Sequence, residues 1–214
     1  MKLGLSQRVD IHPGTGERRD CLDQEWTRLL ESLGYQLRPL PNTLVDLPSY
    51  LEAQALDGIV LTGGNDLAHL EGAVHVAPER DATEARLIEW AVQNGTSVLG
   101  ICRGMQMLAA NYGTRLSRIE GHVAVEHEIE RAPGAVLPLE ARELTNSFHD
   151  FGIAAEDLAE ELRIEAVDSE GRVEALRHRT EPLYGIMWHP ERGALTRRDE
   201  GIFEAVFRSP RNLG

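Results

Sequence analysis

Residues 98–106 read Val-Leu-Gly-Ile-Cys-Arg-Gly-Met-Gln, an apolar run that ends abruptly at Cys102. Helix-forming residues follow at once, so the run fits a buried parallel strand that turns into a helix at the cysteine. Gly100 and Gly104 flank Cys102 and permit a tight turn with close packing of the helix on the strand. A thiol at a helix N-terminus faces unpaired backbone N–H groups and the positive end of the helix dipole, which favour the thiolate. The stretch therefore predicts a nucleophile.

A lone free cysteine is more commonly an inert buried residue than a nucleophile. Two other stretches favour the nucleophile in this chain. Residues 57–66 read as a second buried strand that runs into a Gly63-Gly64 turn, and residues 183–191 read as a third strand that ends at His189. Ligands of parallel α/β sheets bind at the carboxyl ends of the strands, so we expect the three segments to meet at one site.

The rest of the chain alternates strands and helices that end at Gly or Pro turns. Strands are predicted over 2–8 and 35–40, helices over about 20–33, 49–55, 78–94, 103–113 and 197–208, and loops over 10–19 and 67–77. Residues 115–178 contain short alternating runs, at 123–130 and 173–178, which indicate half-exposed antiparallel strands. The pattern predicts a single α/β domain over 1–214, a three-layer sandwich with a mostly parallel central sheet and a small antiparallel extension.

Composition restricts the partners and the compartment. The net charge of −13 disfavours nucleic acids and anionic membranes as partners, although a local arginine cluster still suits a small anionic substrate. Cys21 and Cys102 cannot build a disulfide framework, and the sequence has no run of 18 apolar residues and no signal-peptide core. These features predict a cytoplasmic protein, and a reducing cytoplasm suits a working thiolate.

A histidine and a carboxylate follow the third strand. His189 precedes a proline, which favours an extended conformation, and alternate side chains of an extended segment face the same side. Glu191 therefore lies beside His189. A carboxylate that orients an imidazole, which in turn activates a thiol, is the logic of a catalytic triad. An accidental surface pair is the alternative for a single His-x-Glu, but the Cys102 turn favours catalysis.

The three segments resemble the class I glutamine amidotransferases. The resemblance covers residues 57–191 and joins three motifs in the expected order, Gly63-Gly64-Asn65-Asp66, Gly100-x-Cys102-x-Gly104-x-Gln106 and His189-Pro190-Glu191. It implies the flavodoxin-like fold of that family and acyl transfer to water through a γ-glutamyl thioester on Cys102. His189 would act as acid and then as base, and Glu191 would orient it. The oxyanion would bind N–H groups of Arg103 and of the Gly63-Gly64 turn.

Within that family the chain looks most like the stand-alone γ-glutamyl hydrolases, which include γ-glutamyl-γ-aminobutyrate hydrolase. Ser6-Gln7-Arg8, Arg18-Arg19-Asp20 and Glu126-His127-Glu128 resemble the branch that frees cytidine diphosphoramidate from its γ-glutamyl conjugate in bacterial surface-polysaccharide synthesis. The resemblance therefore implies a small γ-glutamyl conjugate as partner, with γ-glutamyl-CDP-amidate as the leading substrate and γ-glutamyl-γ-aminobutyrate as the next. It leaves a homodimer open.

Further residues are candidates for substrate binding. Gln106 lies one helical turn after Cys102 and can reach the glutamyl α-substituents, unless it is a surface glutamine. Arg8 and Arg19 flank a loop that can close on an anionic leaving group such as a diphosphate, unless they form a solvated basic cluster. The glutamyl pocket is expected to be lined by Asn146, Ser147, Phe148 and His149, which are otherwise polar loop residues.

Three rival interpretations remain. Ligand-type side chains for a metal occur at His122, Glu126, His127 and Glu128. Their apolar neighbours Val123, Val125 and Ile129 indicate a strand, whereas the spacing needs a helix or turn, so no metal or other cofactor is expected. A glutaminase subunit that supplies ammonia to a separate synthetase would share every catalytic residue. A non-catalytic binding protein on the same fold is the third alternative.

Overall fold

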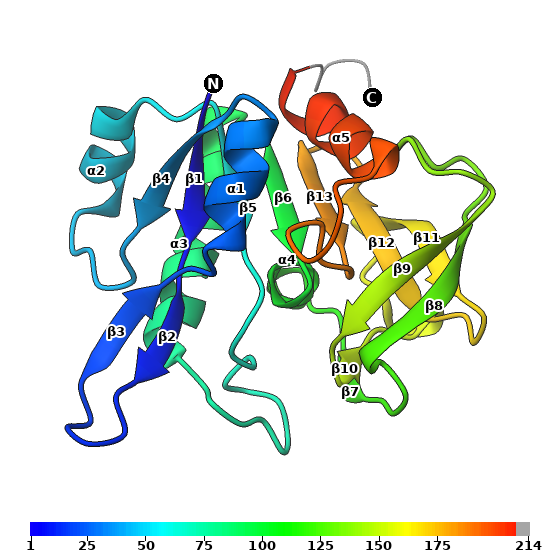
Figure 1. Cartoon of the computed structure of the whole chain (residues 1–214), viewed down its shortest axis with the longest axis horizontal. Coiled ribbons are helices and arrows are strands. Elements are labelled where there is room, and N and C mark those ends of the chain that lie inside the picture. Colours follow the sequence, from blue (N-terminus) through cyan, green and yellow to red (C-terminus); the bar gives the residue numbers. More distant parts are fainter. Residues whose placement is uncertain (209–214) are drawn as a thin grey trace.

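The computed structural model describes residues 1–208, which are built around one nine-stranded sheet with the order β4-β1-β5-β6-β13-β12-β11-β8-β9 (Figure 1). Five strands run parallel: β4 (Gln36–Leu40), β1 (Lys2–Ser6), β5 (Gly58–Leu61), β6 (Val98–Ile101) and β13 (Leu183–Ile186). Four antiparallel strands continue the same sheet: β12 (Val173–His178), β11 (Leu162–Asp168), β8 (Val123–Arg131) and β9 (Arg142–Phe148). The predicted fold class is confirmed.

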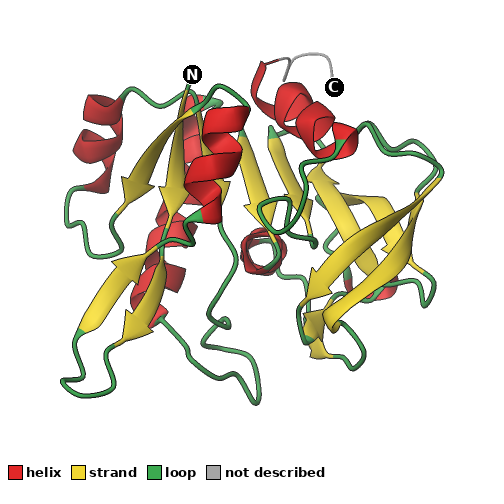
Figure 2. Cartoon of the chain, viewed as in Figure 1, coloured by secondary structure: helices red, strands yellow, loops and turns green. Residues whose placement is uncertain are grey.

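Helices cover both faces of the parallel strands and complete the three layers (Figure 2). One face carries α1 (Glu25–Ser32) and α5 (Arg197–Phe203). The other carries α2 (Leu47–Gln54), α3 (Pro78–Asn94) and α4 (Arg103–Asn111). Two short strands, β7 (Ser117–Arg118) and β10 (Phe151–Gly152), pair beside the antiparallel half, and a 3₁₀ turn follows at Ala155–Asp157. Of the helices described, none is both long and apolar enough to cross a bilayer.

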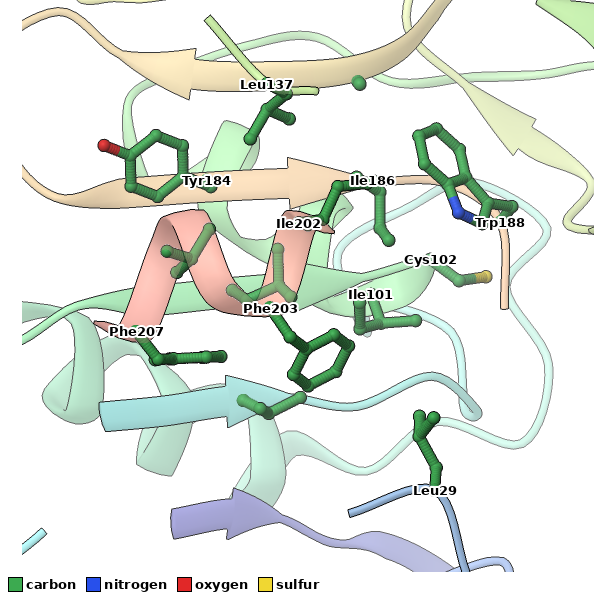
Figure 3. Packing of buried hydrophobic residues seen from close by; sticks show 14 of the residues in the cluster. Leu29, Ile101, Cys102, Leu137, Tyr184, Ile186, Trp188, Ile202, Phe203 and Phe207 are labelled. Atoms are coloured by element: carbon green, nitrogen blue, oxygen red, sulfur yellow. The ribbon is translucent and has the colours of Figure 1, made fainter. Parts of the chain in front are cut away.

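The buried strands divide their side chains between the two helical layers, because successive residues of a strand face opposite sides. In β5, Ile59 and Leu61 pack with α2, α3 and α4, whereas Val60 packs with α1 and α5. Figure 3 shows Ile202 and Phe203 of α5 lying over the β6 and β13 side of the sheet. Burial on both faces explains why these strands read as continuous apolar runs.

The N-terminal third contains the main correction to the predicted elements. Residues 10–19, predicted as a loop, belong to a hairpin of β2 (Arg8–Ile11) and β3 (Arg18–Cys21), and α1 begins only at Glu25 instead of near residue 20. The alternation of polar and apolar residues in β2 covers only four positions, and β3 begins with three consecutive polar residues, so neither has the longer apolar alternation by which a strand is recognised. The helix predicted over 197–208 also changes character, because Glu204–Arg208 forms a π-helical turn after α5.

Candidate active site

Cys102 occupies the turn between β6 and α4, beyond the end of the strand that carries Ile101 (Figure 3). Its φ of 51° and ψ of −108° lie in a region that side chains rarely adopt. A Cβ on Gly104 would lie 2.0 Å from the Leu61 carbonyl oxygen, so only glycine lets α4 approach the sheet this closely. Strained residues of this kind cluster at functional sites. The turn presents the thiol at the N-terminus of α4.

His189 and Glu191 follow β13, the neighbour of β6 in the sheet. His189 Nδ1 lies 2.7 Å from Glu191 Oε1, and both side chains are 2% exposed. The side chain of Asn146 in β9 holds the backbone of this segment through hydrogen bonds. Its Oδ1 accepts the His189 backbone N–H at 2.8 Å, and its Nδ2 donates to the carbonyls of His189 and Arg192. The imidazole is therefore held through both its ring and its backbone.

The charges of Cys102 and His189 stabilise each other. Burial favours the neutral thiol of Cys102, but the charge and hydrogen bond of His189, together with the charge of His149, outweigh it and lower the thiol pKa. Burial likewise opposes protonation of His189, but the Cys102 and Glu191 charges outweigh it and raise the His189 pKa to about 9. The ring nitrogen opposite Glu191, Nε2, has no hydrogen-bond partner among residues 1–208. The lowered thiol pKa and the raised imidazole pKa both favour a thiolate–imidazolium pair, whose Nε2 is available for proton transfer.

The Gly63-Gly64 turn follows β5 at the same sheet edge, and Arg80 of α3 fixes its orientation. The Arg80 side chain is fully buried and donates to the carbonyls of Thr62 at 2.5 Å and Gly63 at 3.1 Å, and also to the Gly64 carbonyl. A carbonyl and the N–H of the next residue point in opposite directions in a trans peptide. The N–H groups of Gly63 and Gly64 therefore point away from Arg80. His189 packs on the turn, since a Cβ on Gly63 would lie 2.7 Å from its Cε1.

Arg103 reaches the same buried network through its side chain. Its guanidinium forms ion pairs with Asp81 and Glu84 of α3, and Glu84 also accepts from Arg80 Nε at 2.8 Å. The network joins the Gly63-Gly64 turn to the first residue of α4, which are the two predicted sources of oxyanion N–H groups. Arg80 and Glu84 carry no sequence signal that marks them as site residues. Their i, i+4 spacing on a helix is equally typical of a surface ion pair.

A cavity of ≈ 130 Å³ opens at the thiol. Cys102, His189, Gln106, Phe148 and His149 line it, together with residues of the two flanking loops. Gln106 is 4% exposed, and its Nε2 donates to the Phe151 carbonyl at 3.0 Å, which fixes the orientation of its amide. Phe148 contacts the His189 ring edge-on with centroids 5.5 Å apart. Gly64 and Arg103 line it as well, so the structure brings seven of the predicted site residues to one small cavity.

Two residues predicted to line the glutamyl pocket do not line this cavity. Asn146 instead anchors the segment that carries His189, as described above. Ser147 is 1% exposed, and its hydroxyl donates to the His122 carbonyl at 2.6 Å. The reason is that only the end of β9 reaches the cavity, so Phe148 and the following His149 face it whereas earlier residues hold neighbouring strands.

Arg8 and Arg19 line a second cavity of ≈ 510 Å³ beneath the β2–β3 hairpin. Asn65 lines both this cavity and the one at Cys102, so the two adjoin. Each arginine already has an acidic neighbour: Arg8 lies 3.1 Å from Asp10, and Arg19 lies 2.7 Å from Glu17. All four side chains are at least 42% exposed, so these surface pairs are weak and can be exchanged for a substrate anion.

The candidate metal ligands of residues 122–128 and the largest of these cavities do not line the cavity at Cys102. Glu126 and Glu128 are exposed on β8, which confirms the predicted strand and separates them from the buried His122. A larger cavity of ≈ 680 Å³ lies over the antiparallel strands and includes none of the predicted site residues.

Comparison with known proteins identifies the family. The sequence model described as Peptidase C26 matches residues 7–191. The chain is 33% identical over 194 residues to gamma-glutamyl-CDP-amidate hydrolase of Campylobacter jejuni, an alignment that covers 90% of each chain. It is 30% identical to gamma-glutamyl-gamma-aminobutyrate hydrolase of Escherichia coli, with 82% of this chain and 80% of the relative aligned.

A solved structure shares the fold. The glutamine amidotransferase of Thermotoga maritima superimposes with a TM-score of 0.67 at 18% identity, covering 99% of this chain and 87% of its own. Because the family model spans most of the 214 residues, and both relatives align over at least 80% of their length, the chain belongs to the Peptidase C26 family of class I glutamine amidotransferase-like proteins and is a hydrolase of C–N amide bonds.

Proposed function

We propose that the chain hydrolyses the γ-glutamyl amide of γ-glutamyl-CDP-amidate, with Cys102 as nucleophile, His189 as acid and base, and Glu191 as the residue that orients His189. The observation that carries the proposal is the buried Cys102–His189–Glu191 series at the mouth of a small cavity. The relative named gamma-glutamyl-CDP-amidate hydrolase supports the choice of leaving group.

In the first half-reaction the Cys102 thiolate attacks the γ-carbonyl carbon of the substrate. The resulting oxyanion binds the Arg103 N–H at the start of α4 and the Gly64 N–H, which Arg80 turns away from itself. The His189 imidazolium donates its Nε2 proton to the departing nitrogen as the C–N bond breaks. The free amidate leaves, and a γ-glutamyl thioester remains on Cys102.

In the second half-reaction neutral His189 takes a proton from water, and the hydroxide attacks the thioester carbon. The same N–H groups stabilise the second oxyanion. Collapse of this intermediate breaks the C–S bond and releases glutamate with the thiolate restored. Glu191 holds the ring through Nδ1 at 2.7 Å in both steps, so the same nitrogen, Nε2, always faces the reacting atoms.

The two adjoining cavities match the two parts of the substrate. The ≈ 130 Å³ cavity suits a glutamyl group, and Gln106 and His149 supply polar groups on its wall. The ≈ 510 Å³ cavity suits a nucleotide, and Arg8 and Arg19 supply the cations that a diphosphate requires. A γ-aminobutyrate leaving group would leave most of the second cavity unused. The arginine-lined space therefore favours the CDP-amidate conjugate.

Glutamate release by the purified chain tests this proposal against its alternatives. We expect the highest kcat/KM with γ-glutamyl-CDP-amidate, a lower value with γ-glutamyl-γ-aminobutyrate, and the lowest with glutamine. A preference for γ-glutamyl-γ-aminobutyrate would remove the nucleotide assignment. A preference for glutamine would instead favour a glutaminase subunit, and no release from any of the three would favour a binding protein.

A further inference from the structure

Four ligand-type side chains gather in the antiparallel half of the sheet, outside the catalytic series. His122 precedes β8, His127 lies within it, Asp168 ends β11 and Glu174 lies on β12. One ligand atom from each residue lies within 4.8 Å of those from the other three. Segments separated by up to 52 positions in the sequence thus converge on one point, with His127 the most exposed side chain at 17%.

Glu174 is a buried carboxylate without a hydrogen-bond donor. Its side chain is 1% exposed, and in the part of the chain that the structure describes neither oxygen has a hydrogen-bond partner. Two imidazole Nε2 atoms, from His127 and His149, lie 3.6 Å away. The nearby Asp168 has Arg172 at 3.4 Å, but no described arginine or lysine forms an ion pair with Glu174. Buried charges are normally paired or coordinate metals, so this carboxylate calls for a cation.

The histidines present lone pairs toward the same point. His122 Nδ1 lies 3.1 Å from the Glu120 carbonyl oxygen, which can only accept, so Nδ1 carries a proton. In the neutral ring Nε2 then holds a lone pair, and it faces Asp168 Oδ2 at 2.9 Å. A contact this short between them requires a proton or a metal ion in between. Neither ring nitrogen of His127 has a hydrogen-bond partner among residues 1–208. A histidine that binds a metal through one ring nitrogen usually donates its other ring N–H to a carboxylate, a backbone carbonyl or water. The contact of His122 Nδ1 with the Glu120 carbonyl has this arrangement.

We propose that His122, His127, Asp168 and Glu174 bind a zinc ion. Two imidazoles and two carboxylates are a ligand set that zinc accepts in tetrahedral geometry, whereas magnesium and calcium prefer oxygen ligands alone. Ligand atoms of a tetrahedral zinc lie about 3.4 Å apart, so the widest separation of 4.8 Å shortens by about 1.4 Å on binding. The divalent charge balances the two carboxylates.

The ion would have a structural role and lie next to the catalytic cavity. It would join β8, β11 and β12, which are adjacent or next-but-one strands of the antiparallel half. Glu174 also faces His149, which lines the cavity at Cys102. All four protein ligands fill the tetrahedral site, and this leaves no open position of the kind that catalytic zinc requires. The site is therefore separate from the cysteine chemistry and does not depend on the proposed substrate.

Zinc content measures the site directly. The full chain with Cys102→Ala is used, because a catalytic thiolate can itself bind zinc. After treatment with a chelator, the protein is titrated with zinc, separated by gel filtration and analysed by mass spectrometry for bound metal. We expect one zinc ion per chain, and visible d–d absorption of a tetrahedral complex when cobalt replaces zinc. Metal content near zero, or an octahedral cobalt spectrum, would overturn the proposal.

The matched variants are His127→Gln and His69→Gln in that background. The His127 ring makes no hydrogen bond with the described residues, so its replacement removes a ligand without breaking one. His69 is exposed and lies outside the cluster. We expect His127→Gln to weaken zinc binding by about 100-fold or more and to lose the rise in Tm that zinc gives, whereas His69→Gln keeps both. Equal zinc affinity in the two variants would contradict the site. If His127→Gln does not fold, the cobalt spectrum of the parent Cys102→Ala protein decides the question.

Discussion

At the scale of single residues, the pairing of Cys102 with His189 determines the pH at which the proposed chemistry runs. The lowered thiol pKa and the His189 pKa of about 9 both favour the charged form of the pair, thiolate and imidazolium. Because the groups are coupled, the limbs of a pH profile report the pair and not either residue alone. The raised His189 pKa therefore places the alkaline limb of the profile above neutral pH.

The alkaline limb responds to Glu191. The charges of Cys102 and Glu191 raise the His189 pKa above its usual 6.5, so the imidazolium that protonates the leaving group is lost as the pH rises through about 9. Glu191→Gln removes one of these charges, and we expect the alkaline limb of kcat/KM to move to lower pH. The profile is measured as glutamate release against pH, with Glu191→Asp as the charge-conserving control. An unchanged alkaline limb in Glu191→Gln would show that the Glu191 charge does not raise the His189 pKa.

The backbone of Cys102 predicts an unusual order of stability. A non-glycine residue at φ 51° and ψ −108° is strained by about 1–3 kcal/mol, whereas glycine costs about 0.4–1 kcal/mol of extra chain entropy on folding. The strain is the larger quantity, so Cys102→Gly should unfold at a higher urea concentration than Cys102→Ala. Both variants lack the thiol, which makes them a matched pair. If Cys102→Gly were less stable than Cys102→Ala, the backbone at residue 102 would not be strained.

At the scale of elements, α3 supports the oxyanion turn through the buried Arg80 and Glu84 and the half-buried Asp81. Removing one partner from a buried charge network leaves another charge uncompensated, which costs about 3–5 kcal/mol. We expect Glu84→Gln to lower the free energy of unfolding by that amount, since Glu84 contacts both Arg80 and Arg103. Glu89→Gln, on the exposed side of the same helix, should change it little. Urea unfolding compares the two, and equal losses would contradict the network.

The β2–β3 hairpin is the element that the proposal assigns to the leaving group. Arg19→Ala should raise KM for γ-glutamyl-CDP-amidate about tenfold, the value of one charged hydrogen bond, and leave KM for γ-glutamyl-γ-aminobutyrate unchanged. Arg28→Ala is the control, because Arg28 is an exposed arginine of α1 that is also ion-paired and does not line the hairpin cavity. Similar losses on both substrates would remove Arg19 from leaving-group recognition.

Helices and strands that are marked by proline, glycine or apolar residues near their ends could be predicted from the sequence, whereas the β2–β3 hairpin could not. The α3 bounds follow from Pro78 at its start and Gly95 past its end, and the structure has them at the predicted positions. The hairpin closes through His12, whose backbone pairs with Glu17 and Gly16, but β2 alternates over only four residues and β3 begins with three consecutive polar residues. Such strands are recognised only from the pairing itself, which a single sequence does not contain.

At the scale of the whole molecule, the sheet order brings distant segments together. The carboxyl ends of β5, β6 and β13 are adjacent, and this places the Gly63-Gly64 turn, Cys102 and His189 at one edge as their motifs predicted. The supporting residues Arg80 and Asn146 could not be assigned in the same way. Each acts through contacts with backbone far away in the sequence, and neither has a local pattern that distinguishes it from a surface residue.

The central claim is that amide hydrolysis depends on the Cys102 sulfur. Glutamate release from γ-glutamyl-CDP-amidate is the direct measurement, made on the parent chain, on Cys102→Ala and on Cys21→Ala, which removes the other free cysteine. We predict that Cys21→Ala keeps the parent rate, while Cys102→Ala loses about 10⁴-fold or more with its fold intact. Release by Cys102→Ala at a rate near that of the parent would contradict the account.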